Sequence, residues 1–230
     1  MKTIGLLGGT GWESTLEYYR IINEKISEAT NNVHTAQIVL FSVDFNDVRN
    51  RIDQNDFKSL GEFFIEKSMG IEQHGADCLL LCANTPHMFA EAISHQISIP
   101  LIHIADATGE KIKENNFSKV GLLGTRPTME MPFYAQRLKE NFGIDVITPP
   151  PAVRDYVHNT IYNEFTRGIF TEEAKARYLE IMQQQREAGA QGIIMGCTEI
   201  PLLIKQSDTD IPLFDTLQIH AEAAVEFAVK

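Results

Sequence analysis

One short polar segment of the chain combines a thiol with two oxygen-bearing side chains. Cys197, Thr198 and Glu199 directly follow the apolar run Ile193–Gly196, at a strand end where a helix is expected to begin. The first turn of a helix offers amide donors and a partial positive charge. These favour a thiolate, which can accept and return protons, and they also favour a bound carboxylate. Cys197 is therefore the leading candidate for an acid/base group in the chain.

The order of apolar runs and polar turns in the first half of the chain occurs again in the second half. Gly5 and Ala83 are 78 residues apart (83 − 5), and the matching Gly121 and Cys197 are 76 apart (197 − 121). Three pairs of segments match: Ile4–Thr10 with Val120–Thr125, Gly75–Ala83 with Gly189–Cys197, and Ile99–Leu101 with Ile211–Leu213. Common α/β motifs would explain each segment alone, but not the shared order and spacing. The repeat predicts two halves of similar fold that face each other across a cleft.

The repeat aligns Cys197 with Ala83, and Gly196 with Cys82. Successive side chains of a strand point to opposite faces. If Cys197 projects into the cleft, Ala83 takes the mirrored position, and Cys82 points elsewhere. Ala83 therefore marks the place of a missing thiol, and Cys82 is a weak candidate that only a twisted strand end would admit. Cys78 and Cys82 lie in an apolar run, where cysteine behaves as a small buried side chain.

The elements that would position these residues alternate between short apolar runs and longer amphipathic segments. Strands are expected at Lys2–Leu7, Gln37–Val43, Asp77–Cys82 and Lys119–Leu123, and helices at Ser14–Ala29, Phe57–Gly75 and Pro86–Ser94. In the first helix, Leu16, Tyr19, Ile22 and Ile26 have helical spacing. This alternation predicts an α/β fold with a mainly parallel sheet in each half, flanked by helices.

Composition limits the classes of partner. The 230 residues, of which 43% are hydrophobic, suffice for one large α/β domain or two smaller ones. A net charge of −11 argues against nucleic acid and against an anionic membrane surface, but not against a small acidic substrate. Three cysteines do not suggest a disulfide framework. The sequence shows no signal peptide and no long apolar run, so a soluble, cytoplasmic protein is expected.

Other kinds of site are poorly supported. The segment Gly9–Ser14 approaches a dinucleotide fingerprint, but it has serine where glycine or alanine is needed, and the chain has no P-loop motif. The seven histidines show no metal-ligand spacing, so no metal site is expected. His87 falls inside a predicted helix and is expected to be structural, while His103 and His220 remain open.

Four motifs together carry a resemblance to a known family: Gly8–Thr15, Asn84–His87, Leu123–Thr125 and Gly196–Glu199. With them, the chain resembles the aspartate/glutamate racemase superfamily, and more closely its broad-specificity amino-acid racemase branch. The resemblance runs from the N-terminus through Ile219–Glu222. It implies an enzyme of the isomerase class that needs no cofactor such as pyridoxal phosphate, and that forms a homodimer. It also implies two pseudo-symmetric α/β lobes, residues 1–100 with 212–230 and residues 101–211, with the active site in the cleft between them.

In typical members of that superfamily, one cysteine precedes the Asn-Thr pair and another precedes the Thr-Glu pair. One thiolate removes the α-proton of the amino acid, and the opposite thiol protonates the other face. This sequence departs from the pattern at Ala83, so that symmetrical two-thiol racemisation is in doubt and the partner of Cys197 is atypical.

Removing a hydrogen next to a carboxylate requires stabilisation of the charge that develops on the oxygens. Residues at the strand ends that could bind the substrate in this way are Thr10, Asn84, Thr85, Thr125, Thr198 and Glu199. Helix capping is the alternative role of such side chains. By the family pattern, a basic residue about thirty positions before the second cysteine binds the side-chain carboxylate of an acidic substrate. Arg167 lies at that distance, and Arg51 is the second choice.

Two other functions stay open. An arylmalonate-type decarboxylase of the same superfamily keeps only the second cysteine, which is the pattern of Ala83 and Cys197. It would release carbon dioxide and protonate one face. A non-catalytic amino-acid-binding protein that lost turnover with its first thiol is the third possibility.

Overall fold

The structure is a computed structural model that describes residues 1–230. The chain divides into two compact units. Unit 1 comprises Met1–Ile104 and His220–Lys230, and unit 2 comprises Ala105–Ile219. The lobes expected from the sequence differ from these units mainly near the C-terminus, because that expectation puts residues 212–219 in the first lobe. They belong to unit 2, since the strand at Leu213–Asp215 pairs within that unit's sheet.

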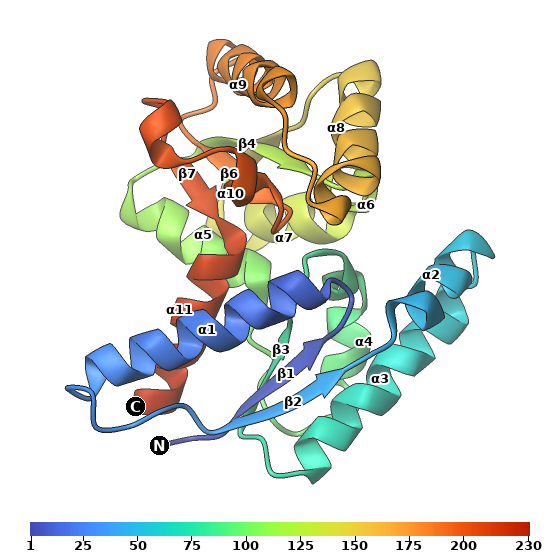
Figure 1. Ribbon diagram of the computed structural model, residues 1–230, viewed down its shortest axis with the longest axis vertical. Helices are drawn as coiled ribbons and strands as arrows, with labels where there is room; N and C mark the ends of the chain where they lie inside the picture. The colour runs from blue at the N-terminus through green and yellow to red at the C-terminus, as the bar shows by residue number, and fades with distance from the viewer. The chain divides into compact units, whose positions relative to one another are not determined.

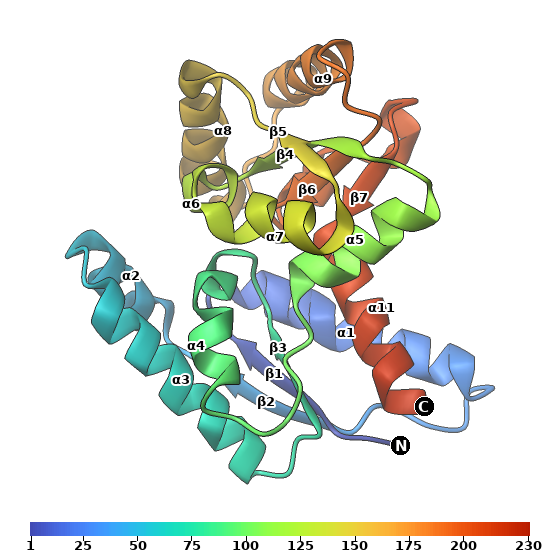
Figure 2. The ribbon, with the colours of Figure 1, turned by 180° about the vertical axis from the view of Figure 1, so that it is seen from behind.

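Unit 1 is built on a three-stranded parallel sheet with the order β2-β1-β3. Its strands are β1 (Ile4–Gly8), β2 (Ile38–Ser42) and β3 (Cys78–Leu81), and its helices are α1 (Trp12–Ala29), α2 (Phe45–Asp53), α3 (Phe57–Gln73), a 3₁₀ turn at Thr85–Phe89 and α4 (Ala90–Ser94). The helix expected at Pro86–Ser94 is thus split between a 3₁₀ turn and α4. Figures 1 and 2 show α1 on one face of this sheet and α3 with α4 on the other.

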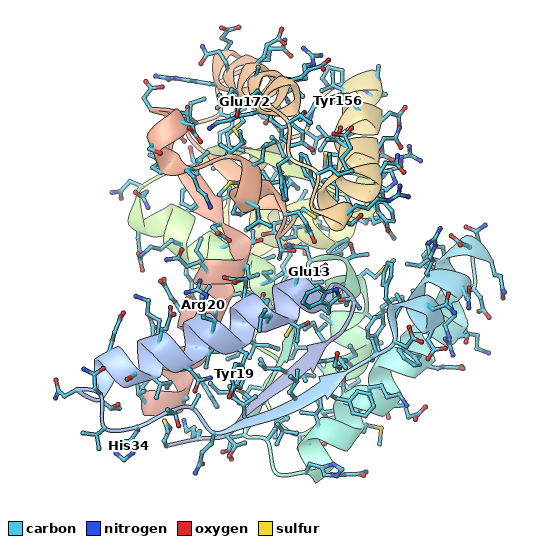
Figure 3. All side chains as sticks on the ribbon, in the orientation of Figure 1. Glu13, Tyr19, Arg20, His34, Tyr156 and Glu172 are labelled. Atoms are coloured by element: carbon cyan, nitrogen blue, oxygen red, sulfur yellow. The ribbon has the colours of Figure 1, made fainter.

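Of the four apolar residues at helical spacing in α1, Ile22 and Ile26 are buried, but Leu16 and Tyr19 are not. Leu16 and Tyr19 are 55% and 50% exposed, while Tyr18, Ile22 and Ile26 are fully buried. The cause lies at the start of the helix, where the Thr15 hydroxyl accepts a hydrogen bond of 2.9 Å from the Gly9 amide and turns Thr15 inward. Residues three, seven and eleven positions later then follow it into the core. Tyr19 can be seen on the outside of α1 in Figure 3.

Unit 2 has a four-stranded parallel sheet with the order β5-β4-β6-β7. Its strands are β4 (Lys119–Gly124), β5 (Asp145–Ile147), β6 (Ile193–Gly196) and β7 (Leu213–Asp215). The helices are α5 (Ile104–Glu114), α6 (Arg126–Glu130), α7 (Pro132–Phe142), α8 (Pro151–Asn163), α9 (Glu172–Glu187) and α10 (Ile200–Leu203), with 3₁₀ turns at Phe165–Arg167 and Gln206–Asp208. The last helix, α11 (Thr216–Val229), starts in unit 2 and lies mostly in unit 1.

Strand register bears out the internal repeat. Gly5 pairs with Leu79 in the first sheet, and Gly121 pairs with Ile193 in the second. The third repeated segment also takes an equivalent place. The Leu79 amide donates to the Pro100 carbonyl at 2.9 Å, and the Ile193 amide donates to Pro212 at 2.8 Å. The α/β fold with one parallel sheet per half, flanked by helices, is therefore confirmed. None of the helices is both long and apolar enough to cross a membrane.

Candidate active site

In each sheet, the strand that comes first in the chain has a neighbouring strand on both sides, so the direction of strand addition reverses there. In unit 1 the chain leaves β1 for β2 on one side and reaches β3 on the other, and in unit 2 it leaves β4 for β5 and later reaches β6. Open α/β sheets bind ligands beyond the carboxyl ends of the strands at such points. Most of the predicted site residues follow these four strand ends: Thr10, Ala83, Asn84 and Thr85 in unit 1, and Thr125, Cys197, Thr198 and Glu199 in unit 2.

The turn after β1 is tight and brings Thr10 to the strand end. Gly9 has a φ of +90°, and a Cβ there would lie 2.1 Å from the Val43 carbonyl oxygen, so only glycine fits. The Thr10 hydroxyl is buried without a hydrogen-bond partner. Because buried polar atoms are almost always paired, this hydroxyl is a natural contact for a bound polar group.

The turn after β3 alternates in exposure as the sequence predicted. Cys82 is fully buried, Ala83 and Thr85 are half-buried, and Asn84 is 4% exposed. The Cys82 amide donates to Leu7 at 2.9 Å and so continues the ladder, which shows that the strand end is not bulged. Burial raises the pKa of the Cys82 thiol far above its ordinary value.

In unit 2, Thr125 and Cys197 are neighbours across the ladder. The last registered pair is Gly124 with Gly196, and these two residues follow it directly. A Cβ on Gly196 would lie 3.1 Å from the Leu123 carbonyl oxygen and 2.8 Å from the Leu122 side chain, so any side chain before the cysteine would require these neighbours to shift.

The Cys197 thiol is hydrogen-bonded to a carboxylate. Its Sγ donates to Glu199 Oε2 at 2.7 Å, and the Thr198 hydroxyl donates to the same oxygen at 3.0 Å. Burial, and then the charge and hydrogen bond of Glu199, raise the pKa of this thiol well above its ordinary value. The amides of Thr198 and Glu199 oppose this rise but do not outweigh it. The helix-start amides do lower the pKa as expected, but a resting thiolate does not follow, because burial and then the Glu199 carboxylate raise the pKa more.

The chain is similar to one known protein family and to several solved structures. The sequence model of the Asp/Glu/hydantoin racemase family matches residues 7–224. This chain belongs to that family. A candidate Asp/Glu racemase from Yersinia pestis has a similar structure, with a TM-score of 0.95, 41% identity and full coverage of both chains. An aspartate racemase homologue from Pyrococcus horikoshii OT3 gives 0.86 and 31%, again over both full chains. The broad specificity amino-acid racemase RacX of Bacillus subtilis (strain 168) is 27% identical over 96% of each sequence.

As a member of the Asp/Glu/hydantoin racemase family, the chain is an enzyme of the isomerase class. The two arginines that the sequence singled out have different surroundings in this racemase. Arg51 is held within unit 1, where Nε donates to Ser59 Oγ at 3.1 Å, a terminal nitrogen donates to the Asp47 carbonyl at 2.6 Å, and the guanidinium lies over Phe63. Arg167 ends the 3₁₀ turn after α8 and is exposed.

Sequence reasoning about this racemase missed one neighbour of the thiol. Tyr178 on α9 is fully buried in the same apolar cluster as Cys197, and its hydroxyl donates to the Val157 carbonyl at 3.2 Å. Burial, and after it the nearby Cys197, raise the pKa of Tyr178, so the ring stays neutral. No sequence signal could have found it, because α9 comes before β6 and only folding brings the two residues together.

Proposed function

We propose that this protein is a cofactor-independent amino-acid racemase in which Cys197 is the principal acid/base group. The observation that carries the proposal is the Cys197–Glu199 contact of 2.7 Å at the carboxyl end of β6. The proposal is supported by this pairing of a thiol with a proton acceptor at the carboxyl end of a strand, where α/β proteins bind ligands, and by Thr125 at the end of the adjacent strand β4.

The contact suggests how the thiol becomes a base. As Cys197 Sγ gives its proton to Glu199, the S–H bond breaks, an O–H bond forms on the carboxyl group, and a thiolate is left. The thiolate then removes the α-proton of the amino acid, and the electron pair of the broken C–H bond passes into the substrate carboxylate. The reverse role needs no such preparation, because the resting thiol already carries the proton that it would return.

For the opposite face of the α-carbon, we propose an atypical partner. Ala83 has no group that can move a proton, so a water molecule or the Thr85 hydroxyl takes this role, with buried Cys82 as the weaker candidate. Racemisation is therefore slow and unequal for the two enantiomers. Kinetic coupling between Ala83→Cys and Cys197→Ser tests whether residues of both turns serve the same reaction.

We infer that the substrate is an amino acid such as aspartate or glutamate, or one of a broader range. Hydroxyl and amide groups of Thr10, Asn84, Thr85, Thr125 and Thr198 would bind its α-carboxylate. For an acidic side chain, Arg167 is the better cation, because Arg51 already donates to Ser59 and to the Asp47 carbonyl.

One observation favours a second candidate function. A resting thiol at Cys197 with alanine at position 83 suits the one-sided protonation of an arylmalonate-type decarboxylase. Incubation of the purified protein with single L-amino acids in deuterated water separates the functions. Deuterium incorporation with inversion supports the racemase, and incorporation with retention means that only one face is served. Tight binding without exchange would indicate a binding protein, and release of carbon dioxide from an arylmalonate would indicate the decarboxylase.

We further propose that two copies associate through the outer edge of the unit 1 sheet. Strand β2 is the last strand on that side, contains no charged residue or proline, and leaves Leu40 and Phe41 44% and 41% exposed (Figure 1). The unpaired backbone groups of such an apolar edge strand can hydrogen-bond to a strand of another chain. In a dimer with a two-fold axis, β2 of one copy would pair antiparallel with β2 of the other. Light scattering should give twice the mass of the 25.9 kDa chain. Leu40→Lys should restore a monomer, whereas the exposed control Val229→Lys should not.

A further inference from the structure

His87 contacts the backbone of the turn that carries Ala83 and Asn84. His87 is 2% exposed, and its Nδ1 lies 2.9 Å from the Ala83 carbonyl oxygen. The backbone amide of the same residue donates to the Asn84 carbonyl at 3.1 Å. Both carbonyls of the turn therefore face His87.

The protonation state of His87 follows from its partners. On the other side of the ring, Nε2 lies 3.2 Å from the Ile104 amide. A carbonyl can only accept and an amide N–H can only donate, so the ring is neutral with its hydrogen on Nδ1. His103 and His220 pack against this ring, with centroids 4.6 and 5.5 Å away.

The second imidazole in this packing is fixed in the same way. His220 Nε2 lies 2.7 Å from the Ile102 carbonyl, and Nδ1 lies 2.7 Å from the Tyr18 hydroxyl. Its hydrogen is therefore on Nε2, and Tyr18 donates to Nδ1. His220, one of the two rings that pack against His87, is thus neutral and held by its own hydrogen bonds, so the His87 ring has little freedom to turn.

The direction of two amide donors follows from these contacts. In a planar trans peptide the carbonyl and the N–H point in opposite directions, and the chain has no cis peptide bond. Because the Ala83 and Asn84 carbonyls face His87, the N–H groups of Asn84 and Thr85 point away from it, at a turn where Ala83 and Thr85 are half-buried. Adjacent amide donors aimed the same way suit a carboxylate.

We propose that His87 is a positioning residue, whose ring holds the Ala83 carbonyl and so aims the Asn84 amide at the α-carboxylate of the substrate. The Thr85 amide beside it is oriented by the backbone hydrogen bond from residue 87 to the Asn84 carbonyl, which does not depend on the side chain. This inference rests on the proposed function. It assigns to the histidine of the Asn-Thr-Pro-His segment a role in orienting donors, in place of the purely structural role expected from the sequence.

Two substitutions separate this role from a merely structural one. In His87→Asn, the side-chain nitrogen can take the place of Nδ1 and donate to Ala83, while the contact to Ile104 is lost. In His87→Gln, the side-chain oxygen can take the place of Nε2 and accept from Ile104, while the contact to Ala83 is lost. Each variant removes one of the two ring contacts, so a general loss of packing affects both alike.

We expect His87→Asn to keep kcat/KM within about 3-fold of the unmodified enzyme. His87→Gln should lose about 10- to 100-fold, as expected for a misdirected hydrogen bond to a charged group. Hydrogen exchange of the amides in residues 83–89, measured without substrate, should speed up in His87→Gln and stay near normal in His87→Asn. Because the exchange measurement needs no turnover, it remains informative if the racemase function fails. Equal losses in both variants, or the reverse order, would overturn the proposal.

Discussion

Ala83 and Cys197 occupy the same register position in two different sheets. Ala83 comes four residues after Leu79, which pairs with Gly5 in the first sheet. Cys197 comes four residues after Ile193, which pairs with the equivalent Gly121 in the second sheet. The fold therefore provides two equivalent strand-end positions, and only one of them holds a thiol. This asymmetry sets the expectations for the following variants.

Replacing Cys197 by serine should lower turnover about 10²- to 10⁴-fold, the usual contribution of a positioned acid/base group. A serine hydroxyl fits the site, but it is far too weakly acidic to take the place of a thiolate. Turnover is measured by chiral chromatography. Binding is followed separately through the fluorescence of Trp12, the sole tryptophan, which stands two residues after Thr10. Near-normal turnover, in a preparation free of contaminating racemase, would rule out the role of Cys197.

Ala83→Cys should raise racemisation in both directions, because it supplies a thiol at the position equivalent to Cys197. The half-buried methyl group of Ala83 leaves access for the added sulfur. Rates from the L- and the D-enantiomer are compared with those of the parent enzyme. In the double variant Ala83→Cys/Cys197→Ser the gain should disappear, since a single thiol again serves one face only.

Cys82→Ala should leave kcat/KM nearly unchanged. The Cys82 side chain is fully buried, so a substrate bound at the turn does not reach it, and burial also raises its pKa. Loss of the buried sulfur should cost about 1 kcal/mol in the free energy of unfolding, measured with urea. Loss of activity in Cys82→Ala, together with no gain in Ala83→Cys, would instead make Cys82 the second acid/base group.

Glu199→Gln should separate thiol acidity from catalysis. The Glu199 carboxylate helps to keep the pKa of Cys197 raised, so the neutral amide should lower that pKa and speed alkylation of Cys197 by iodoacetamide at pH 8. Turnover should nevertheless fall, about 10²-fold, because an amide cannot accept the thiol proton. Mass spectrometry of the labelled peptide assigns the reaction to Cys197. Unchanged alkylation would mean that Glu199 does not control the thiol.

The buried imidazoles should make the protein sensitive to acid. Burial lowers the pKa of His220 from 6.5 to about 4 and lowers that of His87 as well. Protons therefore bind the unfolded chain first, and the free energy of unfolding should fall as the pH drops from about 6.5 toward 4. The contribution of His220 is about 3 kcal/mol.

Urea unfolding at pH 7.5, 5.5 and 4.5 tests this acid dependence. His220→Gln, which can still donate to the Ile102 carbonyl, should flatten it, and the exposed control His95→Asn should not. An unchanged slope in His220→Gln would contradict the assignment.

The sequence alone determined the repeat, the parallel sheets and the alignment of Ala83 with Cys197. Alternation along a strand and matched spacing are local properties, and they carry over directly into register. They do not determine which face of an amphipathic helix is buried. Leu16 and Tyr19 have the right spacing, yet the single hydrogen bond between Gly9 and Thr15 rotates the face of α1 toward Tyr18.

The tertiary structure alone decided the electrostatics of the site. Glu199 is two residues from Cys197 in the sequence, but only the folded chain buries the thiol and brings the Glu199 carboxylate to 2.7 Å from it. Burial first, and then this carboxylate, raise the pKa of Cys197 and oppose the predicted thiolate. His87 depends on contacts with Ile104 and with the ring of His220, which lies far along the chain. Such directed contacts leave no periodic trace in a sequence, because hydrogen bonds depend on distances of tenths of an ångström that only packing sets.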